Sequence, residues 1–498
     1  MNRRDWFFLL LIVFIALALR LSYIYPDHIV LGYDQMVDLF SARKIVEYHD
    51  LVVQESELNS LGINHGVLFS YFTAIFYFLG RGNPVVIAMG YVGLHLISLL
   101  TVYFFILLLF KDKLAAFIGV WLFTISWRLI LMAGWISLTT AGLFATPLFY
   151  LGFWYYAKGR KRGLLLSAFS LGLLIQSQWL MLYQLLTIPL VWLGLRLRFP
   201  KVKTFVGSVV ILMLTLSTLI VAEIKTNFST VKIFMNPAGR LDEVSMPLLG
   251  RTNLLLSQYL TNFSDLLFPY AGLIILPLFI WVLVRNWRTE KKSLFILLIF
   301  IFSPLFMVGI GYHDQPWSLL ATYPAIIILT GYTLSKILER RGVLILLFFI
   351  TLFNLSQTII YKKSDTLFIP QEASSTLKGQ LAVVDYTYHE AGGQSFTINA
   401  VSYPLYRDLY WSYHYPTYGL HRYGYLPGWI GGDQLYPCDA LPKATADDNI
   451  IFMIIDETRA IPALYKNIGK EWGNDYGKLI KEVKIGGFTV QKFVRYEK

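Results

Sequence analysis

The chain has 498 residues, of which 56% are hydrophobic and only 15% are charged, and its mean hydropathy is +0.55. A soluble domain usually carries about a quarter charged residues, so this composition excludes an ordinary soluble protein. Together with many apolar runs of about 20 residues, it predicts a polytopic α-helical membrane protein. The single cysteine, Cys438, excludes an intramolecular disulfide.

The formal net charge of +12 does not indicate nucleic-acid binding, because the basic residues fall in short clusters between apolar runs. Such clusters are typical of the cytoplasmic loops of membrane proteins. Six of them stand at residues 3–4, 111–113, 158–162, 196–203, 285–292 and 336–341. We therefore expect a multi-pass protein of the plasma membrane with a cytoplasmic N-terminus, membrane lipids as partners and no nucleic acid.

The first apolar run, residues 6–24, is expected to remain as an uncleaved helix, because no small-residue cleavage site precedes residues 20–23. Residues 67–79 are apolar but too short for a span, and a crossing there would put the cluster at 111–113 outside. We therefore expect an interfacial or re-entrant helix within a long first external loop, residues 25–83. About eleven spans follow, at residues 6–24, 84–110, 114–130, 136–157, 163–178, 179–196, 204–222, 264–284, 293–311, 318–337 and 342–361.

After this membrane domain of residues 1–362, the composition changes. Residues 363–498 contain several Pro and Gly residues and alternating apolar runs. Residues 395–401, 449–455 and 486–493 are predicted strands, and residues 381–388 are either a strand or a short helix. About 135 residues suffice for a small α/β domain. With about eleven spans and a cytoplasmic N-terminus, we expect this domain to lie outside the cytoplasm.

One acid stands just past the first span. Asp34 is either a solvated loop acid or the general base for a hydrophilic substrate at the membrane surface, since the hydrocarbon excludes carboxylates. Asp38 follows one helical turn later on the same face if residues 35–46 are helical. We expect Asp38 to be a solvated or capping acid, with catalysis as the less favoured alternative.

The order of several motifs resembles a known family. These motifs are Asp34 after the first span, then residues 64–72, 78–84, 126–128 with Trp135, and 172–178. In this order they resemble the integral-membrane glycosyltransferases related to protein mannosyltransferases (glycosyltransferase family 39) and to the lipid A aminoarabinose transferase. These enzymes share the GT-C fold. The resemblance covers about residues 1–340 and a tail of a type found in some members.

The resemblance implies transfer of a sugar from a polyprenyl-phosphate donor to an acceptor hydroxyl at the outer face, with inversion and with Asp34 as general base. The acceptor is a protein, a lipid or a glycan. The leaving phosphate needs cations or hydrogen-bond donors, for which Arg is well suited. The chain departs from the family pattern where Gln35 replaces a second acid and where residues 130–135 contain none. No cofactor is expected, and a divalent metal is possible but not favoured.

Several polar residues of the external segments are candidates for substrate binding, and each also has an ordinary structural explanation. Arg128 either contacts the donor phosphate or extends to the lipid headgroups. Gln176 and Gln178 either line the donor pocket or satisfy a helix turn. The remaining candidates, which anchor loops in the alternative interpretation, are His65, Arg240, Arg251, His313 and Asp314.

Two other function classes remain open. A polytopic transporter or a flippase of lipid-linked or polar solutes would carry ionisable residues at the midplane and often two matching halves, neither of which is visible here. A membrane-anchored binding protein would not need about eleven spans. No nucleophilic triad, P-loop or dinucleotide motif is present.

Overall fold

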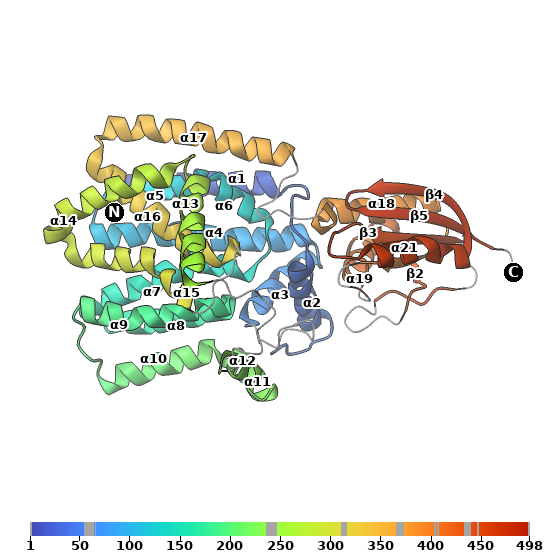
Figure 1. Cartoon of the computed structure of the whole chain (residues 1–498), viewed down its shortest axis with the longest axis horizontal. Helices are drawn as coiled ribbons and strands as arrows, with labels where there is room; N and C mark the ends of the chain where they lie inside the picture. Colours follow the sequence, from blue (N-terminus) through green and yellow to red (C-terminus); the bar gives the residue numbers. More distant parts are fainter. Residues whose placement is uncertain are drawn as a thin grey trace.

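The computed structural model describes residues 2–53, 64, 66–235, 247–309, 316–364, 373–402, 405, 408–432, 440–445 and 448–496 (Figure 1). Most helices belong to one bundle. Its helices are α1 (Arg3–Ile24), α4 (Pro84–Phe110), α5 (Lys113–Ile125), α6 (Trp127–Leu131), α7 (Gly142–Ala157), α8 (Arg162–Ser177), α9 (Gln184–Gly194), α10 (Val202–Thr215), α11 (Ser217–Lys225), α12 (Ser229–Met235), α13 (Leu248–Leu266), α14 (Ala271–Phe302), α15 (Leu305–Gly309), α16 (Tyr323–Ile337) and α17 (Arg340–Lys363).

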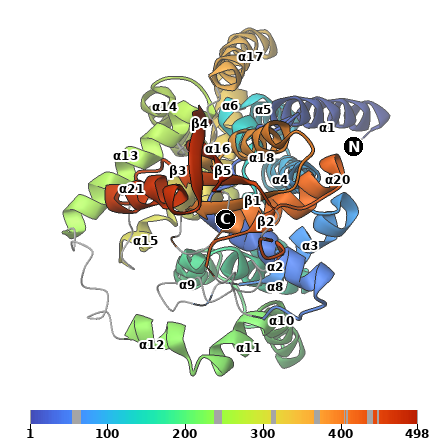
Figure 2. The same cartoon turned by 90° about the vertical axis from the view of Figure 1, so that its right-hand side faces the viewer.

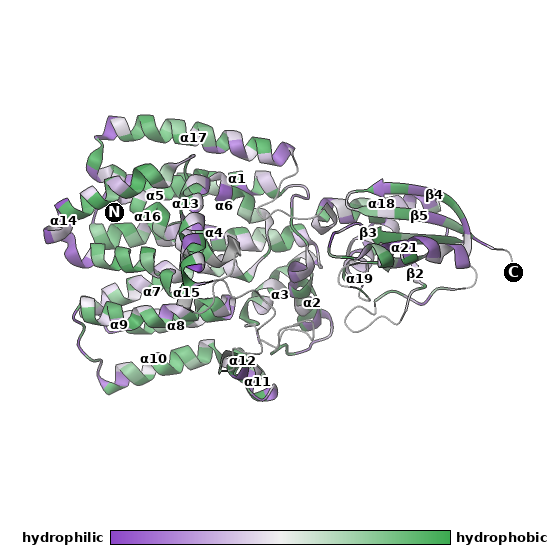
Figure 3. Ribbon diagram, in the orientation of Figure 1, coloured by the Kyte–Doolittle hydropathy of each residue, from purple (hydrophilic) through white to green (hydrophobic). Residues whose placement is uncertain are grey.

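The bundle confirms a multi-pass α-helical membrane protein. Five helical segments of the described chain are long and apolar enough to cross a bilayer, or up to seven if each of two bent helix pairs counts as one span. The helices are hydrophobic around much of their surface (Figure 3) and expose large apolar side chains such as Phe7, Phe14 and Phe349, as lipid-facing helices do. The larger number of eleven spans stays a prediction.

A buried arginine ends the third predicted span early. Arg20 of α1 is completely buried, and its guanidinium donates to the carbonyl oxygens of Phe123 and Thr124 at 3.0 and 3.4 Å. These carbonyls lie at the end of α5, where the last turn of a helix has no intrahelical donors and carries partial negative charge. Beyond Ser126 the chain turns by 53° into α6, so residues 114–130 form a broken helix instead of a straight one.

Basic loops from distant parts of the sequence meet at one end of the bundle. Lys336 forms ion pairs with Asp112 at 3.4 Å and with Glu290 at 3.3 Å, where α14 bends. Lys113 pairs with Asp5 at 2.7 Å, which brings the N-terminus to the same end. Four of the six basic clusters therefore share one end, as a common cytoplasmic face requires. The C-terminal sheet lies at the opposite end (Figure 1).

Two helices of the first loop lie between the bundle and the C-terminal region (Figure 1). They are α2 (Tyr33–Glu47) and α3 (Leu68–Gly80). With 13 residues, α3 is about 20 Å long, which is too short for a hydrocarbon layer of about 30 Å. It buries Phe69 and Tyr77 and exposes Phe78 and Leu79, as expected for a helix that lies along the membrane surface.

The C-terminal residues form a mixed sheet with helices packed on it. The strands β1 (Phe396–Val401), β2 (Gly428–Trp429), β3 (Ile450–Asp456), β4 (Gly477–Ile485) and β5 (Phe488–Arg495) have the order β2-β1-β3-β5-β4. The first three are parallel, and β5 and β4 are antiparallel to their neighbours. The helices are α18 (Leu377–Ala391), α19 (Leu409–His414), α20 (Leu420–Tyr423) and α21 (Ala463–Trp472).

Three strands coincide with those predicted from the sequence. They are β1, β3 and β5, and every residue of β3 is buried, as its continuous apolar run indicates. Residues 381–388 are helical, within α18. The strand β4 was not predicted because its Lys and Glu residues face solvent from the sheet edge. The division into domains at residue 362 stays a prediction.

The C-terminal region contacts the first loop through hydrogen bonds, and Figure 2 views the molecule from the side of this region. The Tyr413 hydroxyl donates to the carbonyl oxygen of Gly82 at 2.7 Å, and the Arg43 guanidinium donates to the carbonyl oxygen of Ser412 at 3.0 Å. Arg43 also pairs with Glu47, which accepts a hydrogen bond from Tyr77. This polar network, in which Arg43 is buried and Glu47 is partly exposed, connects α19 to α2 and α3.

Gly82 allows this close contact. It has φ of +79°, and a Cβ atom there would lie 2.7 Å from Thr417 Cγ2. We expect Gly82→Ala to lower the free energy of unfolding by more than the about 1–2 kcal/mol that the left-handed backbone alone costs an L-residue. Thermal unfolding of the purified protein measures the effect.

Gly159→Ala is the matched control, because Gly159 has φ of +80° but open space around its Cα. Equal losses of stability in the two variants would show that the contact with Thr417 contributes nothing.

Candidate active site

A short extended segment leads into α2 and is held from two sides. The Val30 amide donates to the carbonyl oxygen of Gly134 in the bundle at 2.7 Å. On its other side, the Leu31 amide donates to Ser375 O at 2.8 Å, and the Leu377 amide donates to Ile29 O at 3.1 Å. Each half of the chain therefore contributes backbone hydrogen bonds to the same three residues. The start of α2 is fixed relative to both.

A buried glutamine completes this attachment. Gln380 of α18 donates from Nε2 to Leu31 O and to Ser374 O, both at 2.8 Å. Its Oε1 lies 2.7 Å from Nε2 of His414, which must therefore carry the proton. Burial lowers the pKa of His414 to about 3, so the imidazole is neutral at physiological pH. Sequence reasoning missed both residues, because neither lies near the first loop in the sequence.

Asp34 lies in the first turn of α2 and is exposed. It follows Val30 by four positions, so the two-sided attachment determines where the start of its helix stands. Asp38 lies one turn further and is 5% exposed. The prediction of a solvated Asp38 is therefore wrong: this face of α2 packs onto the protein, and Asp38 lies near enough to Tyr91 of α4 to interact with it electrostatically. Of the two acids, only Asp34 is open to a substrate.

Arg128 has an acidic partner that the sequence did not reveal. Its Nε lies 3.6 Å from Oδ2 of Asp265, in the last turns of α13, and only 14% of the side chain is exposed. The side chain is therefore directed at least in part to a protein partner, and contact with a donor phosphate stays a prediction. Burial raises the pKa of Asp265, and the guanidinium beside it opposes that rise. The sequence did contain a signal for this partner, because Asp265 is an acid at the boundary of an apolar run. It was overlooked because the predicted span 264–284 includes residue 265.

Arg128 and Asp34 belong to the same end of the bundle. The short helix α6 runs through residues 132–134 to the carbonyl of Gly134, which binds the Val30 amide. From this junction Asp34 is four residues away and Arg128 is six. Both candidates therefore stand within a few residues of the same backbone contact, and their membership of one site stays a prediction.

Gln176 connects three segments. Its Nε2 donates to Thr215 O at 2.8 Å and to Thr218 Oγ1 at 2.9 Å, across the bend between α10 and α11. Its Oε1 accepts from the Leu68 amide at the start of α3 at 3.4 Å. These bonds use the whole amide group, which fits the structural alternative. Contact with a donor stays a prediction.

Gln178 differs from Gln176. It is buried at the end of α8, and its Oε1 has no hydrogen-bond partner within the part of the chain that the structure describes. A buried acceptor without a donor is costly, so this group remains a candidate for a ligand. Arg251 stands near the start of α13, about 21 Å along the helix from Asp265, and so it is not placed with Arg128. His65, Arg240, His313 and Asp314 lie outside the described residues.

Among the described residues, no three or more His, Cys, Asp or Glu side chains are grouped so that they could hold a metal ion. That no cofactor is needed, and that a divalent metal is not favoured, stay predictions.

Comparison with solved structures decides the fold. ArnT from Cupriavidus metallidurans, solved with undecaprenyl phosphate bound, superposes with a TM-score of 0.63 over 99% of this chain and 98% of its own, at 12% identity. Its apo form gives a TM-score of 0.64 over 97% of each chain. The chain has the GT-C fold. No family model and no curated protein sequence matches it.

The GT-C fold also appears in a more distant neighbour. The oligosaccharyltransferase of Archaeoglobus fulgidus, solved with a tethered acceptor peptide that contains the NVT sequon, has a TM-score of 0.50 at 12% identity. It is matched over 98% of this chain and 74% of its own. Both neighbours confirm the resemblance drawn from the motif order. At this identity they establish the fold alone.

Gln380 offers a direct test of the attachment of α2. Replacing it by Leu removes the donor from two carbonyl oxygens and the acceptor from His414. Each buried polar group left unpaired costs about 1–3 kcal/mol, so we expect Gln380→Leu to lower the melting temperature clearly and to speed hydrogen exchange of the amides of residues 30 and 31.

The control is Gln394→Leu, which makes the same change at an exposed position shortly after α18. If Gln380→Leu had the same melting temperature as this control, and if the amides of residues 30 and 31 stayed protected from exchange, Gln380 would not hold residues 29–31 in place.

Proposed function

We propose that this protein transfers a sugar from a polyprenyl-phosphate donor to an acceptor hydroxyl at the outer membrane face, with inversion at the anomeric carbon. The observation that carries the proposal is the end-to-end match to ArnT, which was crystallised with undecaprenyl phosphate. The exposed carboxylate of Asp34 at the end of the bundle supplies a group that suits the reaction.

Asp34 acts as general base in this proposal. A carboxylate is ionised at neutral pH and removes the proton from the acceptor hydroxyl as its oxygen attacks the anomeric carbon. The new glycosidic bond forms on the face opposite the phosphate, and the bond between the anomeric carbon and the phosphate oxygen breaks. The electron pair of that bond leaves with polyprenyl phosphate. A displacement on one face with departure from the other inverts the configuration.

Arg128 is the candidate to stabilise the leaving phosphate. Its guanidinium has five donors in a fixed fork and pairs well with a phosphate, even while one side contacts Asp265. Asp265 then has a positioning role. It orients the Arg128 guanidinium and offsets part of the desolvation penalty of burying that positive charge. Gln178, with its unpaired amide oxygen, suits the hydroxyl groups of a sugar.

We further infer that the C-terminal region lies outside the cytoplasm. The basic clusters that meet at the opposite end support this orientation by the positive-inside rule. A reporter enzyme that folds only outside the cytoplasm, fused after residue 498, is expected to be active, and the same reporter at the N-terminus is expected to be inactive. The reverse pattern would contradict the orientation.

Asp34→Asn tests the reaction. With purified protein, a polyprenyl-phosphate sugar and a panel of acceptors, we expect the substitution to lower kcat by about 10²–10⁴, the usual contribution of a general base. Binding of the donor should stay close to that of the wild type, because the amide has nearly the same size and the donor phosphate does not contact this residue in the proposed mechanism. Released polyprenyl phosphate is the measured product.

Asp27→Asn is the matched control, since Asp27 is an acid of the same loop that precedes α2. Wild-type turnover in a folded Asp34→Asn variant would overturn the assignment of the base. Turnover that continues in the presence of a chelator would show that no exchangeable divalent metal is needed. Movement of intact donor across vesicles without release of polyprenyl phosphate would instead favour a flippase.

A further inference from the structure

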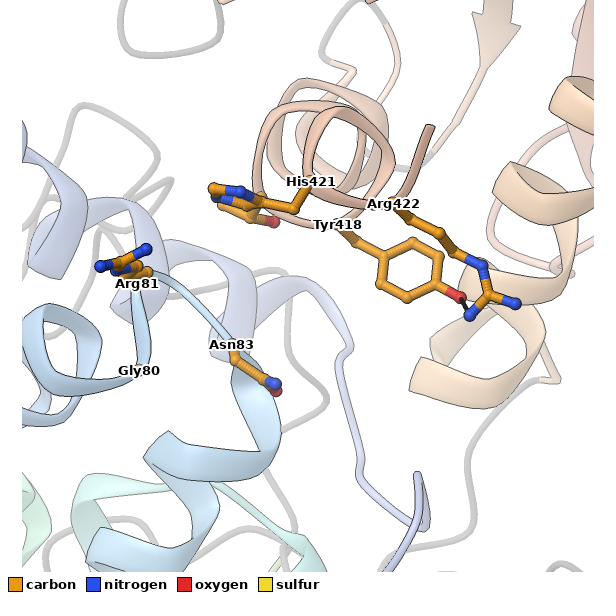
Figure 4. Close-up of a pocket in the computed structure, with 7 residues that line it drawn as sticks. Gly80, Arg81, Asn83, Tyr418, His421 and Arg422 are labelled. Carbon is orange, nitrogen blue, oxygen red and sulfur yellow. Dashed lines mark hydrogen bonds between the residues drawn. The ribbon is translucent and has the colours of Figure 1, made fainter. Parts of the chain in front are cut away.

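A second site candidate lies away from Asp34, where the C-terminal region faces the start of α4. A cleft of about 400 Å³ opens between the α3–α4 turn and the segment that leads into α20. Arg81 and Asn83 stand on one wall, and Tyr418, His421 and Arg422 stand on the other (Figure 4). Gly80 and Thr417 also line it. Both halves of the molecule therefore build the cleft.

The cleft is rich in cations and donors. Arg81 and His421 are exposed and lie across the gap from each other, and neither has an ion-pair partner among the described residues (Figure 4). Asn83 uses its Oδ1 to accept from the Val85 amide at 2.9 Å, which leaves its Nδ2 group available. The N-terminus of α4, a helix of 27 residues, begins here and adds partial positive charge.

One acid faces this cluster. Asp385 lies 3.6 Å from Nε of Arg422 and accepts hydrogen bonds from the hydroxyls of Tyr418 and Tyr423. The Tyr418 hydroxyl in turn accepts from Arg422 at 2.9 Å. This network holds Arg422 in place and balances its charge. The charge of Arg81 is not balanced, so the cleft keeps a net attraction for anions.

The cleft lies at the depth of lipid headgroups. Just before Arg81, α3 exposes Ile75, Phe78 and Leu79 by 57%, 70% and 66% of their surfaces. Just after it, at Pro84, begins a helix long and apolar enough to span the bilayer. A cation between an exposed apolar face and the start of a span stands where the hydrocarbon ends and phosphate groups begin.

We propose that the cleft between Arg81 and His421 binds the phosphate of an anionic membrane lipid, whose acyl chains lie along the exposed face of α3. The phosphate contacts the Arg81 guanidinium, the His421 ring and the Asn83 amide, and so bridges the bundle to the C-terminal region. This inference does not rest on glycosyl transfer, since Asp34 and Arg128 have no part in it.

Lipid titration of the purified full-length protein, followed by native mass spectrometry, tests the proposal. Phosphatidylglycerol is the anionic probe and phosphatidylcholine the zwitterionic one. We expect Arg81→Asn to weaken phosphatidylglycerol binding about tenfold, as loss of one charge-assisted contact does. Asn tolerates the left-handed backbone that Arg81 adopts, with φ of +48°, so the variant is expected to fold.

Three comparisons keep the outcome interpretable. Arg81→Lys, which keeps the charge, should retain most of the binding, and Lys478→Gln, an exposed cation on β4, should leave it unchanged. Excess inorganic phosphate should not displace the lipid. Equal binding by the wild type and Arg81→Asn, equal binding of the two lipids, or displacement by inorganic phosphate would each overturn a lipid site in this cleft.

Discussion

The placement of α2 depends on backbone hydrogen bonds to three residues, Ile29 to Leu31. The bundle contributes the carbonyl of Gly134 and the C-terminal region contributes Ser375, Leu377 and the Gln380 amide. Extended backbone has donors and acceptors on both sides. Residues 29–31 can therefore bind the bundle on one side and the C-terminal region on the other. The exposed acid of α2 therefore stands at a fixed point of the molecule, although it lies in a loop between membrane helices.

Two arginines that are largely removed from water in the bundle each meet a group of opposite sign or an unpaired helix end. Arg20 reaches the terminal carbonyls of α5, and Arg128 reaches Asp265. The two arginines are linked through the chain. Arg20 binds the end of α5, and the bend that follows sets the direction of α6, which carries Arg128. A buried charge in one span thus determines how a candidate substrate contact is presented at the surface.

The sequence predicted features that depend on composition and local pattern. These include the membrane class, the short helix α3, the common end of four basic clusters and the strands β1, β3 and β5. It could not predict partners that are distant along the chain, such as Asp265 for Arg128 or Gln380 for Leu31, because periodicity carries no information on which helices become neighbours. It also assigned Asp38 to a solvated face, since hydrophilic character alone does not distinguish a solvated carboxylate from a buried one.

The attachment of the first loop has a consequence for synthesis. Residues that meet at Leu31 are separated by more than 340 positions, and Arg43 binds a carbonyl that is 369 positions later. At about 5–20 residues per second, a ribosome needs roughly 20–70 s to make the intervening chain. The segment that carries Asp34 is therefore among the first to leave the ribosome and among the last to reach its final position. An unfinished chain already inserted in the membrane lacks the contacts that hold Asp34 in place in the finished protein.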